Sequence, residues 1–134
     1  MKWLLLVPLL VLPGTATADG YGFMTPSTNI CCNGAVLDGY IDCAIIERDS
    51  EPTLPRPAGC AGVWGHDFRL AATGPAEVLC SDSLPGRVNY TDIAPYGQSG
   101  EFGPITCRSE QTGLTCVNQS GHGFFLSRRV QQVF

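Results

Sequence analysis

Short apolar and β-branched runs separated by turn residues dominate the hydrophobic pattern of the chain, and no long apolar stripe of helical period is visible. Turn residues such as Asp38-Gly39 and Thr73-Gly74-Pro75 divide the runs at an even spacing. This spacing predicts an all-β fold, a small disulfide-stapled antiparallel sandwich or barrel. The runs predict strands at residues 28–32, 40–46, 67–71, 76–79, 87–90, 105–109, 114–118 and 124–127.

Two segments fall outside this pattern. Residues 50–59 contain three prolines, which predict an extended surface connection that Cys60 ties down. The last residues, Val130, Val133 and Phe134, predict a short tail that packs back on the domain.

The start of the chain has the pattern of a secretory signal peptide. Lys2 supplies a positive charge, an apolar run extends from Leu4 to Leu12, and Ala16-Thr17-Ala18 matches the small-residue motif before a cleavage site. The run is shorter than the roughly 18 residues that span a bilayer. We therefore expect a signal peptide at residues 1–18, a single disulfide-stabilised β domain at 19–134, no membrane span, and export to the bacterial periplasm or the extracellular space.

The seven cysteines change this picture most. In sequence order, six of them fall into three close pairs, Cys32 with Cys43, Cys60 with Cys80, and Cys107 with Cys116, which leaves Cys31. Disulfides persist in oxidising compartments. Bridges closing loops of about 10 to 21 residues each contribute on the order of 3 kcal/mol, so together they match much of a domain's net stability of roughly 5–15 kcal/mol.

The spacing of the last two cysteines predicts a bridged hairpin. A loop centred on residues 111–112 places Cys107 directly opposite Cys116. Opposed β-carbons at such a position lie within disulfide reach. Once Cys43 pairs with one member of the doublet Cys31-Cys32, Cys60 and Cys80 pair by elimination.

The doublet Cys31-Cys32 leaves one thiol unpaired. Neighbours on a strand point to opposite faces, so only one of the two can face Cys43. A two-residue Asp38-Gly39 turn would put Ile45 across from Cys32, whereas a four-residue loop centred on residues 37–38 puts Cys43 there. The remaining cysteine is either a free thiol or a bridge to another chain, which would give a linked dimer.

Charge limits the classes of partner. The formal net charge is −4, and the only lysine lies in the expected signal peptide. Nucleic-acid binding needs clustered basic residues, which the chain lacks, so we expect no nucleic-acid partner. The cysteines and the two histidines, His66 and His122, lack the spacing of zinc ligands, so we expect no metal and no cofactor.

Several stretches of the chain carry recognisable motifs. They are Phe23 to Ile30 followed by Cys32, Asp42 to Ile45, the proline-rich approach to Cys60, Val63 to Gly65, Gly74 to Cys80, Tyr96-Gly97, Phe102, Cys107 to Cys116, and Gly121 to Arg128. Together they resemble an uncharacterised family of small secreted bacterial proteins, known only as a domain of unknown function. The resemblance covers residues 23–134 and implies a paired-cysteine, all-β extracytoplasmic domain without an assigned activity. It supports Cys32 as the bridged member of the doublet and Cys31 as the extra thiol.

The motif Gly121-His122-Gly123-Phe124 is the most site-like of these. Glycines beside a histidine let the backbone approach a ligand closely, and an imidazole titrates near neutral pH. The alternative is a tight turn in which His122 caps a carbonyl and Phe124 enters the core. No acid or nucleophile is adjacent, so we assign no catalytic residue.

Two further residues are binding candidates. Trp64 forms an aromatic binding patch with Phe68, or both belong to the core. Arg128 can grip a carboxylate or phosphate. Its neighbour Arg129 would point to the opposite face of a strand, so we do not expect a joint clamp.

These observations favour a non-enzymatic extracytoplasmic module that binds a protein or an envelope component. A first alternative is an inhibitor of an extracytoplasmic hydrolase, inserting the proline-rich segment or a loop between cysteines. A second alternative is a small hydrolase that uses His122.

Overall fold

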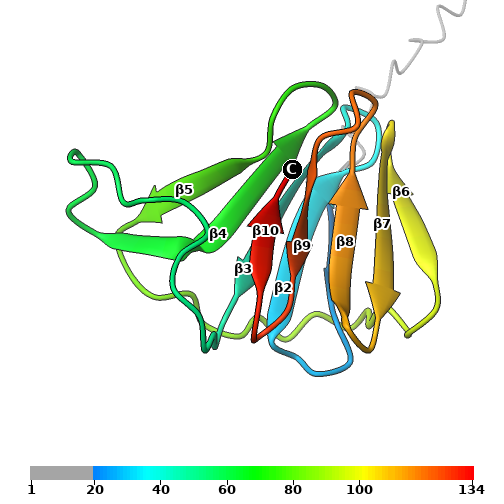
Figure 1. Cartoon of the computed structure of the whole chain (residues 1–134). Helices are drawn as coiled ribbons and strands as arrows, with labels where there is room; N and C mark the ends of the chain where they lie inside the picture. The colour runs from blue at the N-terminus through cyan, green and yellow to red at the C-terminus, as the bar shows by residue number, and fades with distance from the viewer. Residues whose placement is uncertain (1–19) are drawn as a thin grey trace, which may run out of the picture.

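The computed structural model describes residues 20–134, which form two five-stranded antiparallel sheets (Figure 1). The expected signal peptide at residues 1–18 lies outside the described residues. The strands are β1 (Gly20–Met24), β2 (Ile30–Ala35), β3 (Tyr40–Ile45), β4 (Val63–Ala71), β5 (Glu77–Ser81), β6 (Ser99–Phe102), β7 (Ile105–Glu110), β8 (Gly113–Val117), β9 (Gly123–Leu126) and β10 (Gln131–Val133). Their orders, β1-β2-β3-β4-β5 and β10-β9-β8-β7-β6, make each sheet a simple meander.

The two sheets pack face to face and share one hydrophobic core (Figure 1). Alternate residues face inward, as in β7, where Ile105, Cys107 and Ser109 are buried between exposed neighbours. Phe68 of β4 meets Phe124 of β9 across the core, with ring centroids 5.8 Å apart. Each fully buried side chain of this size stabilises the fold by about 1.5–3 kcal/mol. The core therefore holds the two meanders together as one unit.

The all-β prediction is confirmed in its sandwich form. The sheets end in separate edge strands and do not close into a barrel. The strand predicted at residues 87–90 is wrong, because this segment belongs to the connection between the sheets and forms no ladder of backbone hydrogen bonds with a strand. The sequence pattern missed β1, β6 and β10, which are edge strands of the two sheets. Short, polar or glycine-rich edges give little hydrophobic signal.

All three expected disulfides are present: Cys32–Cys43, Cys60–Cys80 and Cys107–Cys116. The first links β2 to β3 across a four-residue loop and the third links β7 to β8 across a two-residue loop, as the register argument predicts. Disulfides are typical of exported proteins. Residues 20–134 contain no helix long and apolar enough to cross a membrane.

Cys31 is free and lies on the opposite face of β2 from the bridged Cys32. Its strand neighbours are Met24 and Ala44, and the residue is only 7% exposed. The connection between β5 and β6 passes beside it, because the backbone of Met24 bonds to Asp92 and Ala94 at 3.0 and 2.8 Å. The thiol is therefore buried, but it lies outside the core that the two sheets share.

Candidate functional site

The order of the strands brings five connections to one end of the sandwich. In a meander, alternate connections lie at the same end of the sheet. The odd-numbered strands of both sheets run toward the same end of the sandwich (Figure 1). The β1–β2, β3–β4, β5–β6, β7–β8 and β9–β10 connections therefore meet at the lower end in Figure 1. We call this the loop end.

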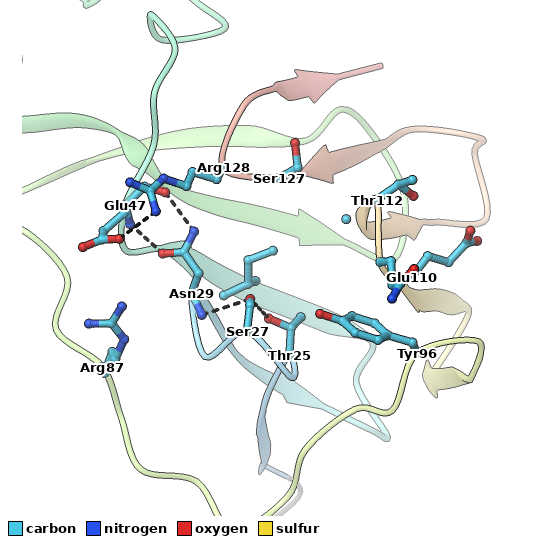
Figure 2. A pocket seen from close by; sticks show the side chains of 13 residues that line it. Thr25, Ser27, Asn29, Glu47, Arg87, Tyr96, Glu110, Thr112, Ser127 and Arg128 are labelled. Carbon is cyan, nitrogen blue, oxygen red and sulfur yellow. Dashed lines mark hydrogen bonds and ion pairs between the residues drawn. The ribbon is translucent and has the colours of Figure 1, made fainter.

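A pocket of about 350 Å³ opens at the loop end, and all five connections contribute to it (Figure 2). Its lining mixes hydroxyl, amide, carboxylate and guanidinium groups above the buried side chain of Ile30. The lining residues are Thr25, Ser27, Asn29, Ile30, Glu47, Arg87, Tyr96, Glu110, Gln111, Thr112, Gly113, Ser127 and Arg128.

Asn29 fixes one wall of the pocket by joining the β1–β2 turn to the end of β3. Its side-chain amide donates to the carbonyl of Glu47, and its side-chain oxygen accepts from the amide of Glu47, both at 2.8 Å. The backbone carbonyl of Asn29 also accepts from Ile46 at 2.8 Å. Three hydrogen bonds between these two segments keep the wall in place without a ligand.

Arg128 extends this wall to the second sheet. Its guanidinium forms ion pairs with Glu47 at 3.3 Å and Asp49 at 3.1 Å, and its carbonyl accepts from the amide of Asp49 at 2.8 Å. Figure 2 shows Arg128 beside Glu47 at the rim. All three side chains are more than half exposed, so each ion pair contributes about 0–1 kcal/mol. The charge of Arg128 is thus already matched by protein carboxylates.

The floor of the pocket carries hydroxyl groups from the β1–β2 turn. The hydroxyls of Thr25 and Ser27 lie 3.2 Å apart, and that of Ser27 accepts from the amide of Asn29 at 3.3 Å. Thr28 has a positive φ of 61°, so the turn curls back tightly at this point. The tight turn presents both hydroxyls to the pocket (Figure 2).

The opposite wall comes from the β5–β6 and β7–β8 connections. Glu110 is paired with Arg108 at 2.9 Å, so its charge is also matched within the protein. Tyr96 is 43% exposed and directs its hydroxyl into the pocket toward Thr25 (Figure 2). Thr112 lies at the tip of the β7–β8 turn above it.

Arg87 is the one charged side chain lining the pocket for which residues 20–134 supply no ion-pair partner. It lies on the β5–β6 connection, exposed, and in Figure 2 stands on the side of the pocket away from Tyr96. A guanidinium presents five N–H donors and stays charged at all physiological pH values. The pocket therefore offers one unmatched positive charge among otherwise compensated groups.

His122 lies at the other end of the sandwich, in the turn between β8 and β9. The side chain of Asn118 organises this turn: its oxygen accepts from the amides of Ser120 and His122, each at 3.0 Å. Gly121 adopts a φ of +80°, which favours glycine, and a β-carbon on Gly123 would lie 2.0 Å from the carbonyl oxygen of Cys116. The glycines of the motif thus serve the turn and the close approach of β9 to β8.

Trp64 is placed in the core rather than in the pocket. It is 7% exposed, and its indole N–H donates to the carbonyl of Leu54 at 2.8 Å, which anchors the proline-rich connection. Phe68 is also buried. Of the three binding candidates, only Arg128 lines the loop-end pocket, and Arg129 does not join it there. The two arginines lie in the β9–β10 turn and not on a strand, so the strand argument about their faces does not apply.

A second cavity of about 360 Å³ lies between the edge strands β1 and β6. Tyr21, Phe23 and Phe102 line it, with ring centroids 5.8–6.2 Å apart. Partial burial raises the pKa of Tyr21 above its ordinary value, and the nearby carboxylate of Asp92, which accepts its hydroxyl hydrogen bond, raises that pKa further. This cavity is an aromatic extension of the core and is separate from the loop-end pocket.

The loop-end pocket is lined by charged and hydrogen-bonding groups. Its hydroxyl, amide and guanidinium groups can bind a polar ligand, and neither histidine lines it. The Nδ1 atom of His66 bonds the carbonyl oxygen of Ile45 at 2.7 Å. Within residues 20–134, no group of three or more His, Cys, Asp or Glu side chains is arranged to hold a metal ion.

No chemical motif in the sequence marks the pocket as a site. Asn29, Glu47, Arg87 and Tyr96 are far apart along the chain and belong to no chemical motif. The stretches that carry the resemblance, residues 23–30, 96–97, 107–116 and 121–128, supply eleven of the thirteen lining residues, all but Glu47 and Arg87. Arg128 is the one lining residue that the sequence predicts as a binding residue, from its charge.

Comparison with models of known protein families gives a match. The model of a family of unknown function, DUF6636, matches residues 4–134. This confirms the resemblance to an uncharacterised family. No curated protein and no solved structure matches the chain.

Proposed function

Because this chain belongs to DUF6636, a family of unknown function, we propose its role from its own geometry: an exported, non-enzymatic module that binds a protein or envelope component through the loop end. One observation carries the proposal. Five connections from both sheets converge on one pocket, whose walls are held by hydrogen bonds and ion pairs that need no ligand. A rigid sandwich presenting loops at one end is a common way to build a binding surface.

Export to the periplasm or the cell exterior is part of the same proposal. Three disulfides support an oxidising destination. The signal-peptide pattern ends at Ala18, and β1 begins at Gly20, so removal of residues 1–18 would take no residue from the sandwich. The N-terminus of the secreted protein, read by mass spectrometry, tests this step, and a mature chain that retains residues 1–18 would contradict it.

Blocking the pocket tests the binding role. The Thr112→Trp variant places a large ring at the pocket, and Thr73→Trp places the same ring in the β4–β5 turn at the other end. We expect the immobilised mature protein and Thr73→Trp to retain one defined envelope component, and Thr112→Trp to retain at least tenfold less. If both variants retain the component equally, or if neither the mature protein nor Thr73→Trp retains one, the loop end is rejected as the binding surface.

An inhibitor of an extracytoplasmic hydrolase is the second candidate, and the proline-rich connection favours it. Trp64 anchors this segment at Leu54, and Arg56 donates to the carbonyls of Cys60 and Gly62 at 3.3 and 2.5 Å. A loop held in one conformation loses little entropy on binding. Replacing Leu54, which is partly exposed, by Asp would weaken inhibition of a target hydrolase and leave loop-end binding unchanged.

The Cys31-linked dimer is a further proposal. Because Cys31 is buried, such a bridge requires the β5–β6 connection to move away from β2. A non-reducing mass map distinguishes the possibilities: a dimer that is lost on reduction and in Cys31→Ser supports the bridge, whereas a monomer with one titratable thiol rejects it.

A further inference from the structure

The charge balance of the loop-end pocket indicates the chemistry of its ligand. Arg128 pairs with both Glu47 and Asp49, and Glu110 pairs with Arg108, which leaves Arg87 as the charged lining residue that has no ion-pair partner among residues 20–134. A guanidinium that lines a pocket and is not itself paired with a protein carboxylate is suited to bind one oxyanion, often through two parallel hydrogen bonds. The complementary ligand therefore carries one negative group.

The rest of the lining fits a hydroxyl-bearing ring. Thr25, Ser27, Thr112 and Tyr96 supply hydroxyl groups, and Gln111 supplies an amide. These groups both donate and accept, as the hydroxyls of a sugar require. The half-exposed ring of Tyr96 adds an apolar face at the edge of the pocket, against which a sugar ring can pack.

Size and position argue for a saccharide over a peptide. A pocket of about 350 Å³ holds the equivalent of about ten water molecules, which is room for one sugar unit. A peptide that binds by adding a strand to a sheet needs a free sheet edge. The pocket lies instead at the ends of the strands, among turns.

We propose that the loop-end pocket binds an acidic sugar unit of a glycan, with Arg87 gripping its carboxylate and Tyr96 packing against its ring. This rests on the proposed binding function and narrows its envelope component to an anionic glycan. Arg87 is then the residue that sets the preference for a charged sugar over a neutral one.

Three probes separate the two parts of the proposed contact: glucuronate carries both ring and carboxylate, glucose carries the ring, and acetate carries the carboxylate. Binding to the mature protein is followed by titration in amide NMR spectra of labelled protein. We expect shifts at the loop end, with glucuronate bound at least tenfold more tightly than glucose or acetate. A charge-assisted, bidentate contact supplies a factor of about this size.

Charge variants assign the preference to Arg87. Arg87→Gln should bind glucuronate and glucose equally, and Arg87→Lys should fall between Arg87→Gln and the unchanged protein, because a lysine keeps the charge without the planar fork. Arg129→Gln is the matched control: Arg129 is exposed, lies next to Arg128 and does not line the pocket. It should keep the full preference.

The proposal is overturned if the unchanged protein does not prefer glucuronate, if Arg87→Gln keeps the preference, or if Arg129→Gln loses it equally. The pocket-blocking experiment separates this failure from that of the binding role. If Thr112→Trp loses envelope binding and the unchanged protein does not bind glucuronate, the binding role of the loop end is kept and the acidic-sugar proposal is rejected. Glucuronate binding with full envelope retention by Thr112→Trp would reject the loop end as the functional surface.

Discussion

Single residues at the two ends of the sandwich have different structural roles. At the loop end, Asn29 holds a pocket wall and Arg87 leaves a charge unmatched. At the other end, Asn118 uses its whole side chain on the backbone: its amide donates to the carbonyls of Ala71 and Gly74, and its oxygen accepts from Ser120 and His122. The histidine that looks most site-like in the sequence is thus held by a structural asparagine.

Removing this asparagine should therefore cost stability. Asn118 is 6% exposed and makes four side-chain hydrogen bonds, so Asn118→Ala leaves several partly buried groups without partners. We expect a loss of about 2–3 kcal/mol in the free energy of unfolding, measured by urea denaturation. Asn89→Ala, on the exposed β5–β6 connection, is the control and should change stability by less than about 0.5 kcal/mol. Equal effects of the two changes would contradict this assignment.

Tyr21 should make stability fall at high pH. Its pKa is raised, first by burial and then by the charge of Asp92 and the hydrogen bond to it, so the folded state favours the neutral phenol. The stabilising effect is complete below the unfolded pKa of about 10 and is lost as the pH rises through the higher folded pKa. Urea unfolding from pH 8 upward should show a smaller high-pH loss for Tyr21→Phe than for the unchanged protein. Parallel pH profiles would show that Tyr21 has no raised pKa.

At the scale of elements, local hairpins account for what the sequence predicts correctly. Cys32–Cys43 and Cys107–Cys116 each cross one hairpin. Loop length and strand parity pair Cys107 with Cys116, whereas parity allows only one of Cys31 and Cys32 to face Cys43, and the family resemblance favours Cys32. The predictions fail where an element depends on distant neighbours. The edge strands β1, β6 and β10 have weak patterns, and the run at residues 87–90 has the composition of a strand but no partner.

The Cys60–Cys80 bridge should hold the β3–β4 connection in place. Cys60 ends the long β3–β4 connection and the bridge ties it to β5, whereas the other two bridges join strands that are already paired. We expect Cys60→Ala with Cys80→Ala to cost about 3 kcal/mol and to expose residues 46–62 to a broad-specificity protease. Cuts are mapped by mass spectrometry. The matched control, Cys107→Ala with Cys116→Ala, should gain no cut in 46–62, and protection of this segment in both variants would contradict the prediction.

At the scale of the whole molecule, the contact between the meanders is decisive. Every strand pair is local within its own sheet, and no disulfide joins the two sheets. The sheets are therefore held together by side-chain packing across the shared core, where Phe68 meets Phe124. This packing also aligns the loops of the two sheets at one end.

A double-mutant cycle tests this contact. Phe68→Leu and Phe124→Leu, alone and together, should show a coupling energy of about 0.5–1.5 kcal/mol, the range for aromatic pairs in contact. Thermal unfolding should remain a single transition in all four proteins, because neither sheet can bury its inner face alone. Additive effects, or separate transitions for the two sheets, would show that the sheets are not coupled through these rings.

The sequence, together with the family resemblance, determined the β class, the three disulfides and the loop of the Cys107–Cys116 hairpin. These features depend on residues a few positions apart, where side-chain alternation and turn chemistry act directly. Only the tertiary structure decided which loops meet and which charges are matched. Arg87, Tyr96 and Arg128 come from separate connections, and only the packing of one meander on the other brings them to the same pocket. The pairing of Glu47 with Arg128, which leaves Arg87 unmatched, is likewise a result of that packing.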